Sequence, residues 1–115
     1  MGSESNVTYE LTQTPDGRIY VRYLPQGVKV GSRQRYLTVA TYPLKNAYAT
    51  TLSGAGQKTS VKVSVGGGGV AYYGKQIPNS VYVAYPGSNY QIEVYDPSQG
   101  RARSLVTGGH VVPVR

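Results

Sequence analysis

The stretch SVYVAYPGSNYQIEVYD, residues 80–96, decides the fold of this chain. Alternate positions carry Val, Val and Tyr before the Pro86-Gly87 pair, and Tyr, Ile and Val after it. A period of two gives a strand one buried face and one wet face, which is typical of an antiparallel sheet. The Pro-Gly pair predicts a turn, because proline presets φ and glycine accepts a positive φ. We therefore predict strands over 80–85 and 90–95, joined by a tight corner.

The rest of the chain repeats this strand-and-turn pattern. Its 15 glycines and 7 prolines punctuate the sequence at short intervals, and apolar residues at helical spacing with flanking caps are almost missing. Segment 44–56 fits either a short strand at 48–52 or one turn of helix. The further predicted strands are 7–12, 18–24, 34–42, 58–65, 70–73 and 101–107, with a terminal extension at 110–114. Such a count and spacing predict an all-β fold.

The corner itself carries a family resemblance. Residues 86–94, PGSNYQIEV, resemble the E-to-F corner of fibronectin type III and related immunoglobulin-like domains, which often read Leu-x-Pro-Gly-Thr-x-Tyr-x-Val-x-Val. The chain departs from that pattern at Ala84, where the leucine stands, and it contains no tryptophan. The resemblance implies an antiparallel immunoglobulin-like β-sandwich with a structural corner of Pro86, Gly87 and Tyr90. In that corner the Tyr90 hydroxyl group bonds to nearby backbone.

The resemblance also implies strands E, F and G at 80–85, 90–95 and 101–107, and a non-catalytic scaffold used for adhesion, spacing or ligand contact. A small β-barrel is the alternative architecture for the same strand pattern.

Length and composition limit the classes of protein to consider. The chain has 115 residues, which predicts one domain over 6–115, with residues 1–5 disordered or left over from an expression vector. It has no cysteine, so disulfides and cysteine zinc sites are excluded. No apolar stretch is long enough for a membrane-spanning helix. The net charge of +7 favours acidic partners such as nucleic acid, anionic lipid headgroups, wall polymers or an acidic protein.

No pattern in the sequence indicates catalysis. The single histidine, His110, lacks the partners of a metal site or a catalytic triad. Gly66 to Gly69 is followed by neither the Gly-Lys-Ser/Thr ending nor the helix of a phosphate loop, so we interpret it as a hairpin connection or a bulge. The five carboxylates, Glu4, Glu10, Asp16, Glu93 and Asp96, show neither calcium-loop spacing nor a pairing that sequence can place. We expect no catalytic residue, no metal and no cofactor.

Basic and tyrosine side chains interleave on the predicted strands. Alternation over 18–24 places Arg18, Tyr20 and Arg22 on one face, and Arg33 and Arg35 share a face of the next strand. A cationic sheet face that bears tyrosines is what proteins that bind single-stranded nucleic acid use. An ordinary solvated sheet face has the same composition. Among all outward-facing positions, the residues that we expect to contact a partner are Tyr20, Arg22, Tyr72, Tyr82 and Tyr95.

Three functional hypotheses follow from these patterns. The first is a non-catalytic binding or structural module that contacts protein or an anionic surface polymer in an extracellular, cell-surface or virion assembly. The second is a basic β-domain that binds nucleic acid. The third is a filament or capsid subunit that forms homo-oligomers through edge strands, for which 7–12 and 110–114 are the candidates.

Overall fold

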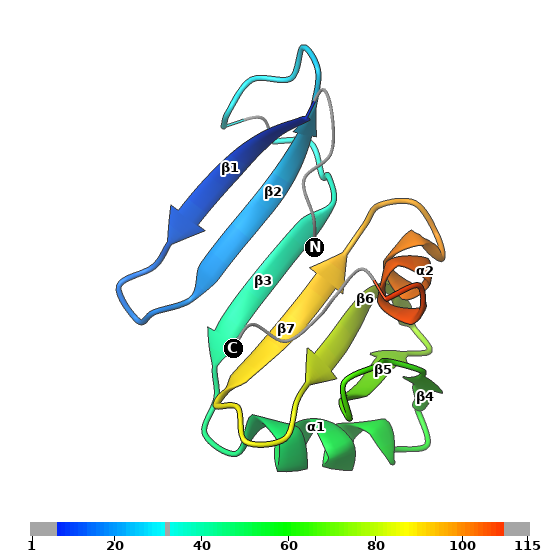
Figure 1. The fold of residues 1–115 in the computed structure, drawn as a ribbon. Coiled ribbons are helices and arrows are strands. Elements are labelled where there is room, and N and C mark those ends of the chain that lie inside the picture. Colours follow the sequence, from blue (N-terminus) through cyan, green and yellow to red (C-terminus); the bar gives the residue numbers. More distant parts are fainter. Residues whose placement is uncertain (1–6, 32, 110–115) are drawn as a thin grey trace.

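The computed structural model describes residues 7–31 and 33–109, so the predicted extension at 110–114 and the predicted disordered residues 1–5 lie outside it. The chain forms strands and two short helices in the order β1–β3, α1, β4–β7, α2 (Figure 1). Their bounds are β1 Val7–Gln13, β2 Ile19–Pro25, β3 Thr38–Pro43, α1 Ala47–Ala55, β4 Ser60–Val63, β5 Val70–Gly74, β6 Ile77–Ala84, β7 Tyr90–Tyr95 and α2 Arg101–Thr107.

The described strands form one seven-stranded sheet in the order β1-β2-β3-β7-β6-β5-β4, and every neighbouring pair is antiparallel. The prediction of an all-β antiparallel fold is confirmed. Strand β7 returns to pair with β3, so segments far apart in the sequence lie side by side in the centre of the sheet (Figure 1). Helices α1 and α2 pack over strands among β4–β7, on opposite faces of the sheet.

The predicted strand at 101–107 is wrong, because these residues form α2. Ala102, Leu105 and Val106 stand at helical spacing, and Ala102 and Val106 are fully buried in the core. Just before the helix, the Asp96 carboxylate accepts the Ser98 amide, a local turn that reverses the chain. Segment 44–56 takes the helical alternative and forms α1, which buries small residues at every fourth position, Ala47, Thr51 and Ala55.

The predicted corner forms a turn between β6 and β7, in which Gly87 has φ 80°. The prediction for Tyr90 is wrong, since its side chain is 51% exposed and its hydroxyl group donates no hydrogen bond to the described backbone. The physical reason is that β6 and β7 pair directly in the same sheet. The tyrosine therefore has no second sheet to bridge, and it stands opposite Pro43 at the end of the strand.

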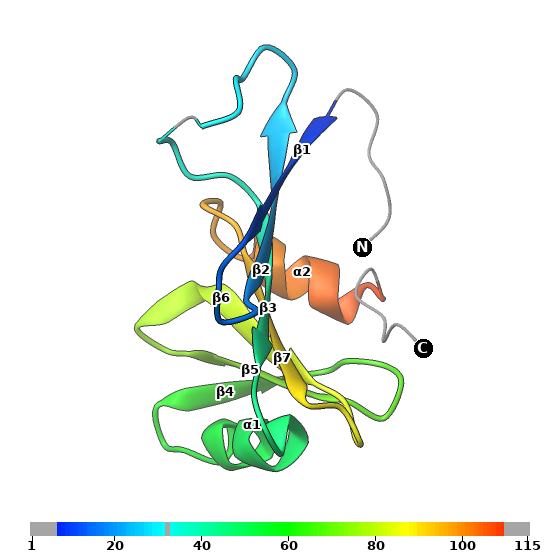
Figure 2. The same ribbon diagram turned by 90° about the vertical axis from the view of Figure 1, so that its left-hand side faces the viewer.

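The sheet has two different faces, and each helix packs on a different one. On the valine face, Val81, Val83 and Val94 pack against Ala102 and Val106 of α2. On the opposite face, which we call the groove face, α1 contacts β7 through a hydrogen bond that the Gln91 side chain donates from Nε2 to Thr51 Oγ1 at 3.0 Å. In Figure 2 the sheet is seen nearly edge-on, with α2 beside it and α1 at one end.

Both helices lie over strands among β4–β7, and among the described residues neither helix has its backbone close to β1, β2 or β3. We call β4–β6 the covered half of the sheet, and β1–β3 with the connecting segment 33–37 the open half. This difference determines where a ligand or a partner can reach the sheet.

Candidate functional site

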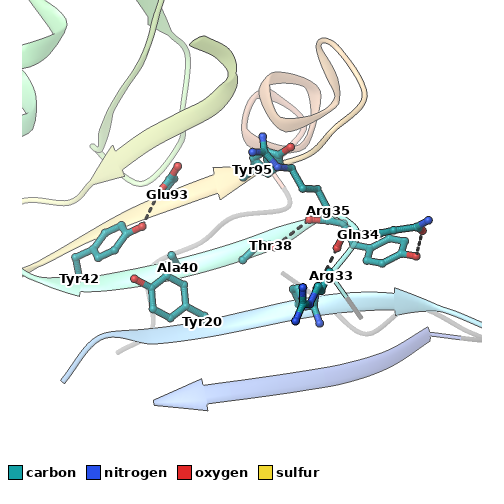
Figure 3. A pocket seen from close by; sticks show the side chains of 11 residues that line it. Tyr20, Arg33, Gln34, Arg35, Thr38, Ala40, Tyr42, Glu93 and Tyr95 are labelled. Carbon is teal, nitrogen blue, oxygen red and sulfur yellow. Dashed lines mark hydrogen bonds between the residues drawn. The ribbon is translucent and has the colours of Figure 1, made fainter. Parts of the chain in front are cut away.

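A groove of about 330 Å³ opens on the groove face, between the open half and β7 (Figure 3). Strands β2, β3 and β7 and the segment that leads into β3 all contribute to it. We call it the sheet groove, and its lining residues are Tyr20, Arg22, Arg33, Gln34, Arg35, Tyr36, Thr38, Ala40, Tyr42, Glu93 and Tyr95.

Ala40 forms the floor of the sheet groove. It is almost fully buried, and its partners across the sheet are Tyr20 on β2 and Glu93 on β7. A methyl group between two long side chains leaves space that a larger residue would fill. The hollow therefore follows from one small residue in a row of large ones.

Glu93 and Tyr42 form one end of the groove. The Tyr42 hydroxyl group donates to one carboxylate oxygen of Glu93, and Ser80 Oγ donates to the other at 2.7 Å. Burial and the bond to Glu93 raise the pKa of the Tyr42 hydroxyl above its ordinary value, so it stays protonated. The ring of Tyr42 also meets that of Tyr20 edge-on, with centroids 5.9 Å apart. These contacts hold both rings in place before any ligand binds.

Glu10 and Arg22 fix the other end of the groove. Arg22 Nε and Nη2 donate to the two oxygens of Glu10 at 2.7 and 3.0 Å, and Arg22 Nη1 donates to the Gln34 carbonyl at 3.1 Å. The Gly31 amide also donates to Glu10, at 2.6 Å. The bond from Arg22, and then that from Gly31, hold the pKa of the Glu10 carboxyl below its ordinary value. Two strands thereby anchor the segment that carries Arg33 and Arg35.

Arg33 and Arg35 are exposed at the rim of the groove (Figure 3). Neither forms a hydrogen bond or an ion pair with the described residues, whereas Arg22 pairs with Glu10 and Arg18 with Asp16. Arg35 also lines a second hollow of about 430 Å³, together with Tyr36, Asp96 and Arg101. Segment 33–36 thus stands between two hollows and carries two positive charges that no described acidic group balances.

The structure brings together three of the five predicted contact residues, Tyr20, Arg22 and Tyr95, in the sheet groove. Tyr72 and Tyr82 lie on the same face but outside the groove. Their rings pack together in the covered half with centroids 5.5 Å apart, and the Tyr72 ring lies directly against Gly54 of α1. Arg22 lines the groove with its charge already matched by Glu10.

Sequence reasoning missed Thr38, Ala40, Tyr42 and Glu93 as groove residues. Alternation already placed Glu93 on the face of Gln91 and Tyr95, but it says nothing about which strand lies next to β7. The pairing of β3 with β7 is a long-range contact, and only this pairing brings Glu93 beside Ala40. No local signal in the sequence predicts it.

The acidic groups of the described residues have separate partners. Glu10 pairs with Arg22, Asp16 with Arg18 and Asp96 with Arg101, while Glu93 accepts from Tyr42 and Ser80. No group of three His, Cys, Asp or Glu residues within 7–31 and 33–109 lies close enough to hold a metal ion. In the same part of the chain, neither helix has the length and apolar character needed to cross a membrane.

Comparison of the chain with protein-family models, with curated proteins and with solved structures finds no match.

Proposed function

We propose that this protein is a non-catalytic binding module whose sheet groove binds an extended anionic polymer. The observation that carries the proposal is the difference between the arginines of the open half. Arg18 and Arg22 each form an ion pair, while Arg33 and Arg35 have no acidic partner among the described residues. Fixed positive charges without a partner attract an anionic ligand and raise its local concentration.

The shape of the site favours a polymer over a small ion. The sheet groove and the second hollow share Arg35 and Tyr36, so a ligand that follows segment 33–36 touches both hollows. Tyr20 and Tyr42 offer rigid rings along the groove, and tyrosine gives contact area at low entropic cost. The separate partners of the described carboxylates support a binding role over acid–base catalysis.

Single-stranded nucleic acid is a second candidate, and the aromatic lining of the groove favours it. Tyr20, Tyr36 and Tyr95 lie in the same groove as Arg33 and Arg35. Proteins that bind single strands combine cations that contact phosphates with aromatic rings on which bases stack. A sulfated polysaccharide carries negative charge but no bases. Comparing its binding with that of single-stranded nucleic acid therefore separates charge attraction from base stacking.

The test is a fluorescence anisotropy titration with labelled oligothymidylate and with a labelled heparin-type oligosaccharide, each at low and at moderate salt. We expect binding that weakens steeply as salt rises. The variant Arg33→Ala/Arg35→Ala should lose roughly tenfold or more in affinity, equivalent to at least about 1.4 kcal/mol. The matched control is Lys58→Ala/Lys75→Ala, which removes the same charge from exposed positions of the covered half and should bind as the parent does.

The outcomes decide between the candidates. Equal losses in the two double variants would mean that net charge alone drives binding, and this would contradict the groove. Absence of binding to both probes at low salt would reject the proposal. The variant Tyr20→Leu should weaken binding of oligothymidylate only if bases stack in the groove.

A further inference from the structure

Glu93 differs from the other carboxylates that the structure describes. Each of the other three forms an ion pair with an arginine. Glu93 forms no ion pair with any described residue, and its two oxygens accept from the neutral hydroxyl groups of Tyr42 and Ser80. It lines the end of the sheet groove that lies away from Arg33 and Arg35 (Figure 3). The groove is therefore positive at its rim and carries an unmatched negative charge at the end formed by Glu93.

The basic residues near this end do not neutralise Glu93. Arg18 Nη1 donates to the Tyr20 hydroxyl group at 3.5 Å, but Arg18 is already paired with Asp16. Lys45, which follows β3, is exposed and forms no ion pair with a described residue. The Glu93 carboxylate repels a phosphate or sulfate group, since it accepts hydrogen bonds but cannot donate them. The part of a ligand that reaches this end must therefore present hydrogen-bond donors.

The hydrogen bonds of Glu93 leave room for two donors. A carboxylate has about four acceptor positions, two on each oxygen. Tyr42 occupies one position on Oε1 and Ser80 occupies one on Oε2, which leaves one position on each oxygen among the described contacts. Two acceptor positions on neighbouring oxygens fit a planar group with two parallel N–H donors, in the way that carboxylates bind guanidinium groups. Tyr42 and Ser80 also hold the carboxylate in place, because they approach it from the two neighbouring strands, β3 and β6.

A slot for a planar group lies beside this carboxylate. Ala40 forms its floor, and the two cross-strand partners of Ala40 are Tyr20 and Glu93 (Figure 3). Neighbouring strands lie about 4.8 Å apart, so the backbones of Tyr20 and Glu93 stand roughly 10 Å apart across the floor. The Tyr20 ring forms the wall opposite Glu93, and tyrosine rings bind bases by stacking. A flat heterocycle placed over Ala40 thus meets a ring on one side and the carboxylate on the other.

We infer that Glu93 and Tyr20 form a guanine-binding site within the sheet groove, which recognises a guanine base of single-stranded nucleic acid. Guanine is the common base whose Watson–Crick edge carries two adjacent donors, N1–H and the N2 amino group. On that edge, adenine and cytosine have a ring acceptor beside their amino group, and thymine has its one N–H between two carbonyl groups. Each of these three bases places an acceptor against Glu93, which costs affinity. The phosphates that flank the guanine extend toward Arg33 and Arg35 at the rim.

This inference rests on the proposed function, in the form in which the ligand is single-stranded nucleic acid. It adds a base preference, which the attraction of Arg33 and Arg35 for phosphates cannot supply, because the phosphates are the same in every sequence. The two proposals therefore fail in different ways. Loss of all binding tests the charges at the rim, whereas loss of discrimination between bases tests Glu93.

The test is a fluorescence anisotropy titration with a labelled oligothymidylate and with the same oligomer in which one central thymidine is replaced by deoxyguanosine. A single guanine avoids the four-stranded assembly of guanine-rich DNA. The wild-type protein should bind the guanine oligomer roughly tenfold more tightly. Replacement of the guanine by hypoxanthine, which lacks the N2 amino group, should remove most of this preference. Replacement by 7-deazaguanine, which keeps both donors, should retain it.

Variants of the protein show whether Glu93 reads the base. Glu93→Gln should abolish the preference, because one of the two acceptor oxygens becomes a donor. The same change removes a negative charge from the groove, so the affinity for oligothymidylate should stay the same or rise, which also shows that the variant is folded. Glu93→Asp keeps the charge but is one methylene shorter, and it should lose the preference as well. The matched control is Asp16→Asn, which removes a carboxylate outside the groove and should keep the preference.

The outcomes separate the guanine site from the groove as a whole. Equal, salt-dependent binding of the two oligomers by the wild-type protein would overturn the guanine site and leave the proposed function standing. A preference that persists in Glu93→Gln, or that Asp16→Asn also loses, would contradict the assignment to Glu93. Absence of binding to every oligomer at low salt would reject nucleic acid as the ligand, and the guanine site with it.

Discussion

The hairpins at the two ends of this single sheet differ in how far helices cover them and in how their charges are matched. The β4–β5 hairpin is short, lies against α1, and carries three lysines and no acidic residue within 58–75. The β1–β2 hairpin is longer, has no helix backbone close to it, and matches its arginines with Glu10 and Asp16. One end is therefore covered by helix and positively charged, while the other is uncovered and neutral. The sheet groove lies in the uncovered half, next to β7.

The largest expected effect concerns the packing of the covered half. Val106 of α2 is fully buried among Val81, Val83 and Val94. Val106→Ala removes two methyl groups and leaves a cavity, so we expect a loss of about 2–3 kcal/mol in the free energy of unfolding. Denaturant titration at low protein concentration measures it.

The matched substitution in the open half is Leu11→Ala. Because Leu11 is mostly exposed in the single chain, we expect a change within about 0.5 kcal/mol. If the two substitutions cost the same, the distinction between the covered and the open half would fail.

Glu10 should make a smaller contribution to the thermal stability of the protein, and this contribution depends on pH. Its pKa in the folded protein lies below the ordinary value of 4.5, mainly because Arg22 donates to its carboxylate. A lowered folded pKa stabilises the protein above the unfolded pKa, and this stabilisation is lost as pH falls through the folded pKa. Glu10→Gln should therefore lower Tm at neutral pH.

The Tm difference from the wild type should shrink as pH falls below 4.5, the ordinary pKa of the carboxyl. Thermal unfolding by circular dichroism across this range measures the difference. The control Glu93→Gln removes a carboxylate from the same face that has no arginine among its hydrogen-bond partners. A difference for Glu10→Gln that does not change with pH would contradict the ionic role of this pair.

Much of the sheet could be predicted from period-two alternation. The strands at 7–12, 18–24 and 90–95 and the turn at Pro86-Gly87 follow from residues close together in the sequence. Helix α2 escaped prediction, because a seven-residue segment with three apolar positions fits either period and the resemblance favoured a strand. Helix α1 is built on Ala and Thr, so its buried face has no strong hydrophobic signal.

The site was predictable only in part. Alternation placed Tyr20 and Arg22 on one face correctly, because facing within a strand is a local property. Which arginine keeps an unmatched charge depends on tertiary contacts. Glu10 reaches Arg22 across the β1–β2 pair and leaves Arg33 and Arg35 without an acidic partner among the described residues. The packing of α1 over Tyr72 could not be predicted either, because it depends on the tertiary structure.

The most direct test of the account is a residue-resolved NMR titration of the isotope-labelled protein with oligothymidylate and, separately, with a heparin-type oligosaccharide. The account predicts that the largest amide shift changes fall on Tyr20, Arg33, Arg35 and Tyr95, around the sheet groove. Those of Lys58, Lys62 and Lys75 in the covered half should change little. Shift changes concentrated on these lysines, or spread evenly over all basic residues, would contradict it.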